Sequence, residues 1–255
     1  MRLFVAIYPS PEALEDIAEQ TKRLRIGAAA GAGINVRLAP RSNLHVTVAF
    51  LGEVADDRLG RVEDALTRAV QDWRHPPATQ QRGTRAGRRR GITLPAEPAV
   101  PVGLAVGAEP AVPVEPAVGA EPAVPVGLAV PGGERAAESG PAAPRLRLGG
   151  GGRFGRGPFT VLWVGLLGEV DAVRRLAAAT RRELRRARVP HDSRPLRPHL
   201  TLARPGERLD RASLDEDLRI LDGYRGPSWP ATELVLVRSH LGPRPTYDRL
   251  ATWPL

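Results

Sequence analysis

The chain has 255 residues, contains no cysteine and carries a formal net charge of +9. The lack of cysteine excludes disulfides, thiolate metal sites and a cysteine nucleophile. The apolar stretch at the start is too short for a signal peptide, and no apolar run approaches the roughly 20 residues of a membrane span, so the protein is predicted to be cytoplasmic. Arginine supplies every positive side-chain charge except that of Lys22, and because a guanidinium fits phosphate oxygens, the charge favours an anionic substrate.

The first 74 residues predict strand, helix, strand and helix in that order. Residues 3–7 form a short apolar strand, and Ser10 followed by proline is typical of a helix N-terminus, which predicts a helix over 11–25. Residues 43–51 alternate between apolar and polar side chains, as in a half-buried strand. Apolar residues at three- and four-residue intervals then predict an amphipathic helix that begins at 56 or 57 and ends at 74.

Residues 75–144 interrupt this pattern. They hold half of the chain's 26 prolines and contain a twelve-residue repeat, in which Ala-Glu-Pro-Ala-Val-Pro-Val begins at Ala96, Ala108 and Ala120. Proline removes backbone donors and prevents helix formation, and most of the other apolar residues are small, so we predict a disordered insert. The folded domain is therefore expected to consist of residues 1–74 and 145–255.

Strand and helix patterns resume at residue 145. Gly150, Gly152 and Gly155 satisfy the G-x-G-x-x-G pattern of dinucleotide-binding loops, but that pattern must open a helix, and here a second strand follows. We therefore interpret the glycines as the loop of a β-hairpin. The remaining sequence predicts helices over 170–188 and 209–221 and strands over 145–148, 159–167, 194–203, 233–239 and 248–253.

A His-x-Thr motif occurs in one predicted strand of each half, as His45 with Thr47 and as His199 with Thr201, and an alanine follows each motif by two residues. Side chains of a strand alternate between its faces, so histidine, threonine and alanine are expected on one face and the aliphatic residues on the other. Strict alternation also places Phe50 and Arg204 on the aliphatic face. A single motif carries little information, whereas two matched copies favour a functional pair.

The order of elements in both halves is an apolar strand, an amphipathic helix, a strand with the motif and a further helix. This repetition indicates two related lobes. The sequence thus predicts an α+β fold with two pseudo-symmetric lobes of antiparallel sheet, helices outside and a central cleft that carries both motifs. If the lobes are related by a pseudo-twofold axis, the two imidazoles face each other across that cleft.

Two facing histidines suit a reaction that needs a base and an acid at once, since an unperturbed imidazole titrates near neutral pH. Displacement at phosphorus is such a reaction, because one ring takes a proton from water and the other protonates the leaving oxygen. The hydroxyls of Thr47 and Thr201 are placed to donate to phosphate oxygens. Arg204 is a further candidate for phosphate binding, provided that it lies at the end of its strand.

The motifs and their surroundings resemble the two-histidine phosphoesterase superfamily, and within it the RNA 2′,3′-cyclic phosphodiesterases, also named 2′-5′ RNA ligases. The resemblance implies that His45 is the proton donor, that His199 is the proton acceptor and that Thr47 and Thr201 hold the phosphate. It also implies hydrolysis of a terminal 2′,3′-cyclic phosphate to a 2′-phosphate without metal or cofactor. The segments that carry it are 2–10, 43–54, 158–166, 194–205 and 233–255.

Other functions stay open at this point. A metal site is disfavoured because neither motif face offers a third ligand, and a serine hydrolase because no G-x-S-x-G motif is present. Within the superfamily, the alternatives are another nucleotide-derived cyclic phosphate, a 2′,5′-linked oligonucleotide, and 2′-5′ ligation as the reverse reaction. A non-enzymatic RNA-binding domain would explain the arginines but not the paired motifs.

The expected partner is an RNA or oligonucleotide with a 2′,3′-cyclic phosphate end. The sequence gives no sign of membrane contact or of an obligatory protein partner, and nothing in it requires more than a monomer.

Overall fold

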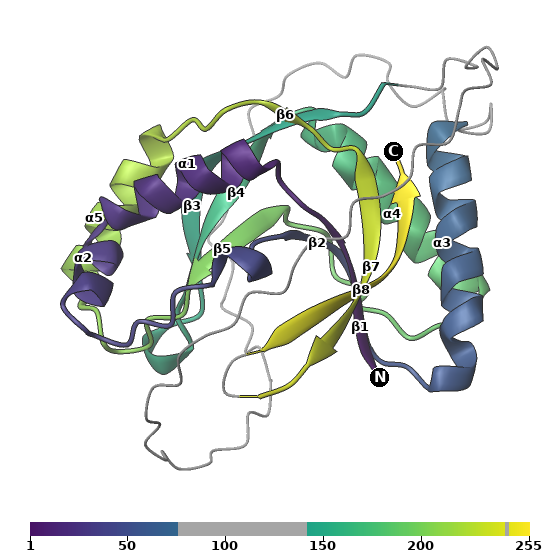
Figure 1. Ribbon diagram of the computed structural model, residues 1–255, viewed down its shortest axis with the longest axis horizontal. Coiled ribbons are helices and arrows are strands. Elements are labelled where there is room, and N and C mark those ends of the chain that lie inside the picture. The colour runs from purple at the N-terminus through teal and green to yellow at the C-terminus, as the bar shows by residue number, and fades with distance from the viewer. Residues whose placement is uncertain (76–141, 243–244) are drawn as a thin grey trace, which may run out of the picture. The chain divides into compact units, whose positions relative to one another are not determined.

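The computed structural model describes residues 1–75, 142–242 and 245–255, which form one eight-stranded sheet and five α-helices (Figure 1). The strands are β1 (Arg2–Ile7), β2 (Val46–Glu53), β3 (Arg145–Phe154), β4 (Val161–Gly168), β5 (His199–Ala203), β6 (Trp229–Pro230), β7 (Glu233–His240) and β8 (Thr246–Pro254). The helices are α1 (Pro11–Lys22), α2 (Arg25–Gly31), α3 (Leu59–Arg74), α4 (Val170–Arg186) and α5 (Arg211–Gly223).

The order of strands in the sheet is β6-β3-β4-β5-β2-β1-β7-β8, and every pairing is antiparallel. The motif strands β2 and β5 lie side by side at its centre and divide it into two half-sheets of four strands. In each half, the motif strand is followed outward by the apolar strand that precedes it in sequence, β1 next to β2 and β4 next to β5. This arrangement gives the sheet the pseudo-symmetry that the repeated element order predicts.

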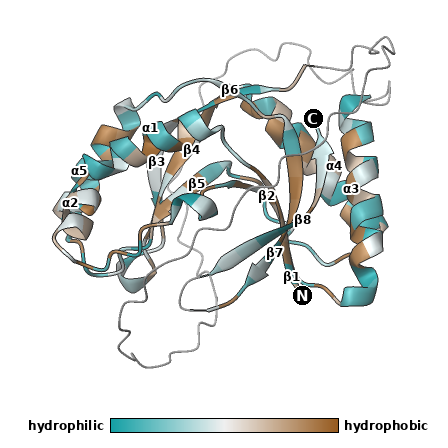
Figure 2. Cartoon of the chain, viewed as in Figure 1, coloured by the Kyte–Doolittle hydropathy of each residue, from teal (hydrophilic) through white to brown (hydrophobic). Residues whose placement is uncertain are grey.

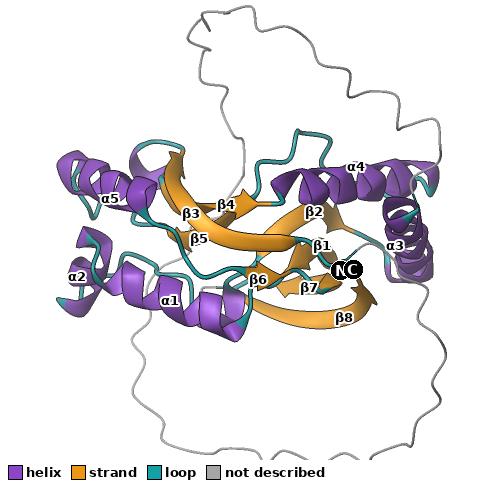
Figure 3. Cartoon of the chain, turned by 90° about the horizontal axis from the view of Figure 1, so that it is seen from above, coloured by secondary structure: helices purple, strands orange, loops and turns teal. Residues whose placement is uncertain are grey.

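The half-sheets do not correspond to halves of the sequence. The C-terminal hairpin of β7 and β8 completes the half-sheet that contains β1 and β2. Helices also cross over: α1 follows β1 but, with α5, contacts β3, whereas α4 follows β4 but contacts β2 and α3 (Figures 1 and 3). Each half-sheet is therefore covered by helices from both parts of the chain.

The main core lies between the helices and one face of the sheet. The aliphatic side chains that alternate along the strands, such as Leu3, Val46 and Leu200, are fully buried there against apolar positions of the helices such as Ile17 and Leu176. Brown apolar segments accordingly alternate with teal polar ones on the helices (Figure 2). A second, smaller apolar cluster of Phe4, Ala6, Val235 and Val237 lies on the opposite face of the sheet.

Local signals begin two of the helices. Ser10 is the N-cap of α1: its side chain accepts a hydrogen bond from the backbone N–H of Ala13 at 3.2 Å. Proline follows at the first helical position, as the sequence predicts. Asp210 caps α5 in the same way through Ser213 N–H at 2.8 Å. The predicted helix over 11–25 ends earlier, because α1 stops at Lys22 and the backbone is extended at Leu24. A second helix, α2, then begins at Arg25.

The glycines at 149–152 lie within a strand, not within the loop that the sequence predicts. β3 continues through them to Phe154, and the connection to β4 begins later, at Gly155, which has a positive φ of 69°. The predicted β-hairpin is thus present, but only Gly155 of the three motif glycines lies in its loop. A Cβ at Gly152 would lie about 2.0 Å from the indole of Trp163, which is its cross-strand partner. Glycine is thus required here so that the aromatic ring can lie against the backbone.

Residues 76–141, and with them nearly all of the insert predicted over 75–144, lie outside the described residues, so the proposed division of the chain stays a prediction. The described residues belong to one compact unit. Within these described segments, no helix has the length and apolar character needed to cross a membrane.

Candidate active site

The two motifs meet where the half-sheets join. Val46 of β2 is paired with Leu200 of β5, and both side chains are fully buried in the main core. Because the strands are antiparallel, this register sets His45 opposite Thr201 and Thr47 opposite His199. The register therefore places the two histidines and the two threonines on the same sheet face, which points away from the main core. We call this face the histidine face.

Both imidazoles are held by the same local contact. The Nδ1–H of His45 donates to the carbonyl oxygen of Asn43 at 2.8 Å, and that of His199 donates to the carbonyl oxygen of Arg197 at 2.7 Å. A carbonyl only accepts, so Nδ1 carries the proton in both rings and, in the neutral ring, Nε2 keeps its lone pair. The pair thus offers two Nε2 atoms as proton acceptors, or as donors once protonated.

Burial keeps both rings neutral near pH 7. Desolvation lowers the pKa of His45 to about 4, against a smaller opposing effect of the bond to Asn43, and the charge of His199 lowers it further. The pKa of His199 is also lowered, first by burial and then by the charge of Arg204, while its bond to Arg197 acts in the other direction. The electrostatic influence of one histidine on the other agrees with their placement on one face.

Both motif strands carry an extra residue directly after the threonine. Thr47 is opposite Ala6 but Ala49 is opposite Val5, so Val48 is bulged. In β5, Thr201 is opposite Trp163 but Ala203 is opposite Leu162, which leaves the residue between them bulged in the same way. The two bulges occupy equivalent positions in the half-sheets.

These bulges overturn the prediction from strict alternation. Ala49 and Ala203 are buried in the main core, not beside the histidines, because one extra residue reverses the alternation after it. For the same reason Phe50 does not enter the core: it lies opposite Phe4, is 36% exposed and stacks with the guanidinium of Arg2 at 5.1 Å.

Arg204 is brought to the histidine face by the same reversal. It follows the buried Ala203 at the end of β5 and is exposed. Its charge lowers the pKa of both His199 and Tyr247, which agrees with a place on this face. The pairing register thus places Arg204 on the histidine face, whereas strict alternation predicts the aliphatic face.

Aromatic side chains contact each histidine, and the motifs themselves do not predict them. The ring of Phe4 stacks on His45 with centroids 4.7 Å apart, and Tyr247 meets the same imidazole edge-on at 5.4 Å. His199 is contacted by Phe154 at 4.9 Å and by Trp163 at 5.9 Å. Alternation along β1 places Phe4 between two core residues and therefore on the histidine face, so this pattern is the sequence signal for the aromatic contact with His45.

The hydroxyls of Thr47 and Thr201 have no hydrogen-bond partner among the described residues, and both side chains are half-buried.

The other three histidines lie away from the motifs: His75 follows the last residue of α3, His191 lies in the loop after α4, and His240 pairs with Asp248 at 2.6 Å on the C-terminal hairpin. Across the described ranges, no three histidine or acidic side chains are grouped closely enough to bind a metal ion.

Comparisons with known proteins agree with this geometry. The family model described as LigT-like phosphoesterase matches residues 12–74 and 165–247, more than half of the chain. The fold is similar to that of Escherichia coli LigT complexed with 3′-AMP (18% identity, TM-score 0.55, 100% of this chain and 97% of that chain covered). It is also similar to a Thermus thermophilus protein (22% identity, TM-score 0.56, 100% and 98% covered). A comparison with curated proteins gave no significant match.

Proposed function

Because the chain belongs to the LigT-like phosphoesterase family of the two-histidine superfamily, we propose that it hydrolyses the 2′,3′-cyclic phosphate at the end of an RNA and leaves a 2′-phosphate. The observation that carries this proposal is the pairing of Val46 with Leu200, which sets the two His-x-Thr motifs side by side on adjacent antiparallel strands. Two imidazoles and two hydroxyls on one face match the needs of in-line displacement at phosphorus.

In the proposed reaction, Nε2 of His199 accepts a proton from the attacking water while the water oxygen forms a bond to phosphorus. The bond from phosphorus to the 3′ oxygen breaks, and Nε2 of His45 gives its proton to that oxygen. The products are a 3′-hydroxyl and a 2′-phosphate, with His199 now protonated and His45 neutral. His199 then releases its proton to solvent, and His45 takes up a proton from solvent.

The remaining polar groups of the histidine face hold the phosphate. The hydroxyls of Thr47 and Thr201 are proposed to donate to its non-bridging oxygens, where negative charge grows in the transition state. Arg204 is proposed to add a charge-assisted contact, since it is exposed at the end of β5 and its charge acts on His199.

Substrate binding is required for His45 to act as the acid. With its pKa near 4 in the empty site, His45 is neutral at pH 7 and has no proton on Nε2. A bound phosphate places negative charge beside the ring, and a nearby opposite charge raises the pKa of an imidazole. The assignment of His45 as donor and His199 as acceptor rests on the family resemblance.

The nature of the substrate is supported by relatives. Escherichia coli LigT has been solved with 3′-AMP, with NADP+ and with ATP, all of which are phosphorylated nucleotides. A nucleotide or oligonucleotide with a cyclic phosphate end is the ligand that we propose here. The cytoplasmic location, the monomeric state and activity without cofactor stay predictions.

Product analysis tests the proposal. An oligoribonucleotide with a 2′,3′-cyclic phosphate is incubated with the full-length protein in EDTA, and the position of the phosphate in the product is determined. We expect a 2′-phosphate. A 3′-phosphate would contradict the proposed leaving group, and turnover only of cyclic mononucleotides, or joining of 2′-5′ ends, would assign another substrate to the same site. Tight RNA binding without any turnover would indicate a non-enzymatic RNA-binding domain.

A further inference from the structure

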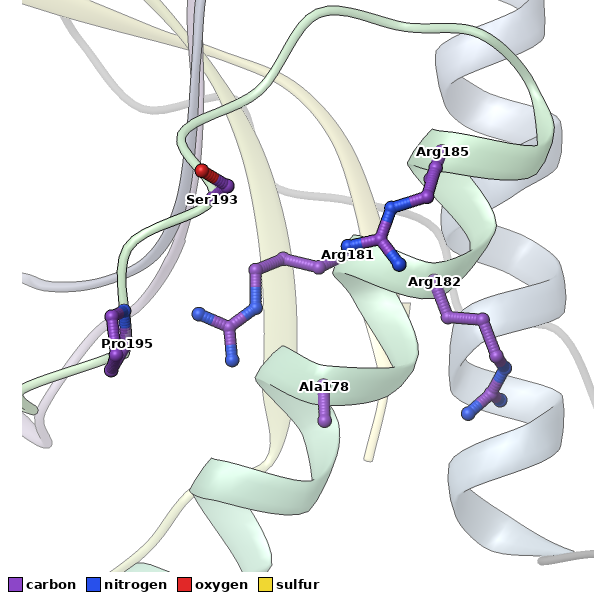
Figure 4. A pocket seen from close by; sticks show the side chains of 6 residues that line it. All are labelled: Ala178, Arg181, Arg182, Arg185, Ser193 and Pro195. Atoms are coloured by element: carbon purple, nitrogen blue, oxygen red, sulfur yellow. The ribbon is translucent and has the colours of Figure 1, made fainter.

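A second group of positive charges lies outside the histidine face. Helix α4 and the loop that leads from it to β5 line an open surface pocket of about 330 Å³ (Figure 4). The lining residues come from one helix and one loop, and they include three arginines, one serine and no acidic side chain: Ala178, Arg181, Arg182, Arg185, Ser193 and Pro195.

The three arginines are not equivalent. Arg182 is neutralised, because it donates to Asp72 of α3 at 2.7 Å and to Glu183 at 3.3 Å. In Figure 4 its guanidinium turns away from Arg181, whose own side chain points toward the loop. Arg181 uses one side-chain donor, to the carbonyl oxygen of Arg194 at 2.7 Å, whereas the guanidinium of Arg185 has no hydrogen bond or ion pair with any residue that the structure describes.

The acidic residue near this pocket is already occupied. Asp192 accepts three hydrogen bonds from the side chain of Arg194, at 2.5 to 3.0 Å, so its charge is balanced locally. The charge of Arg181 acts on Asp192 but forms no ion pair with it, and Arg185 forms none with any described residue. The two arginines lie one turn apart on the same face of α4, because residues four apart share a face of a helix. Adjacent guanidinium groups repel each other, and an anion between them offsets that repulsion.

We propose that Arg181, Arg185 and Ser193 form a phosphate-binding site that is separate from the histidine face. Two guanidinium forks from α4 and a hydroxyl from the loop can surround a tetrahedral phosphate from two sides, which suits its oxygens better than the planar geometry of a carboxylate. The phosphate belongs either to the backbone of a bound RNA or to a free phosphate. The RNA source rests on the proposed function, whereas the free phosphate does not.

The test compares R181Q/R185Q and the single variant R185Q with R175Q in the full-length protein. Arg175 is a matched control, since it is exposed on the same helix, has no ion pair among the described residues and does not line the pocket. Inorganic pyrophosphate is titrated by calorimetry. Binding at the proposed site should be about tenfold weaker or lost in R181Q/R185Q, as expected for the removal of charge-assisted hydrogen bonds, and unchanged in R175Q.

The source of the phosphate is distinguished with a single-stranded oligoribonucleotide that has hydroxyl ends. If RNA occupies the site, R185Q reduces the slope of log affinity against log salt concentration by about 0.7 and R175Q does not. If pyrophosphate binding is weakened but RNA binding is unchanged, the ligand is a free phosphate. If R181Q/R185Q binds both probes as R175Q does, the proposal is wrong.

Turnover of a small 2′,3′-cyclic nucleotide keeps this proposal separate from the proposed function. R181Q/R185Q should retain the wild-type rate, because the pocket residues lie outside the histidine face. Loss of pyrophosphate binding in a protein that shows no cyclic phosphodiesterase activity at all would refute the proposed function and leave the second phosphate site standing.

Discussion

Val46 lies opposite Leu200, and this pair between β2 and β5 sets the register of the two His-x-Thr motifs. Both side chains are fully buried, so the register is set by the core on the opposite face. A shift of the pairing by one residue would turn one motif toward the core, because side chains alternate along a strand. The position of the two histidines is thus specified by apolar residues that never contact substrate.

The first prediction concerns the two motif histidines. H45A and H199A should each reduce kcat for a cyclic phosphate substrate by about 10² to 10⁴, the usual contribution of one acid or base, and should keep the wild-type circular dichroism spectrum. H191A is the matched control: its Nδ1 also bonds a carbonyl oxygen two residues earlier, that of Val189 at 3.0 Å, but it lies in a loop. Equal losses in all three variants would show that the effect is structural.

The pH dependence of turnover should differ between the free and the bound enzyme. Burial lowers the pKa of both histidines below 6.5, so both limbs of the profile of kcat/KM, which reports the free enzyme, should lie on the acidic side of pH 6.5. Bound phosphate raises both values, so the optimum of kcat should lie at higher pH. Steady-state kinetics from pH 4 to 9 measure both. Coincident optima would contradict the proposed effect of substrate charge.

Arg204 should act on the substrate and on His199 at once. Its positive charge lowers the pKa of His199, so R204Q should raise that pKa, shift the imidazole titration to higher pH in nuclear magnetic resonance spectra and weaken substrate binding by about tenfold. R208Q, which removes an exposed charge four residues later, is the control. An unchanged titration of His199 in R204Q would show that the guanidinium does not reach the histidine face.

The free energy of unfolding should decrease as the pH is lowered, because His45 becomes protonated more easily in the unfolded chain. Its pKa is about 4 in the folded protein and about 6.5 in the unfolded chain, so the unfolded state binds more protons between these values. The free energy of unfolding should therefore be fully preserved above pH 6.5 and decrease by up to about 3 kcal/mol as the pH falls to 4. H45Q should lack this part of the decrease in urea unfolding experiments. A parallel pH dependence in H45Q and the wild type would refute it.

Repetition and periodicity predict most of the fold and the residues of the candidate site, because the pattern of apolar residues along β1, β2, β4 and β5 identifies the buried faces of these strands. The bulges after Thr47 and Thr201 are not predictable in this way, since Val48 and Leu202 continue a regular pattern and only the pairing with β1 and β4 reveals the extra residue. The side of the strand on which Arg204 lies follows from that pairing.

Elements that depend on distant residues are not predictable from local sequence either. Helix α2 begins where Asp217 of α5 accepts the backbone N–H groups of Arg25 and Ile26, at 2.6 and 3.0 Å, so its start is set almost 200 residues away. The strand character of the glycines before Phe154 depends on Trp163, whose indole lies against Gly152. Local sequence contains neither partner.

The position of β1 between β2 and β7 has a consequence for synthesis on the ribosome. The half-sheet that carries His199 consists of strands within residues 145–230, and the helices that cover it are complete by residue 223. The half-sheet that carries His45 waits for the last residues of the chain, since β1 has an unpaired edge until β7 is made. A nascent chain released at residue 230 would expose that apolar edge and would contain both histidines without the hairpin that supplies Tyr247.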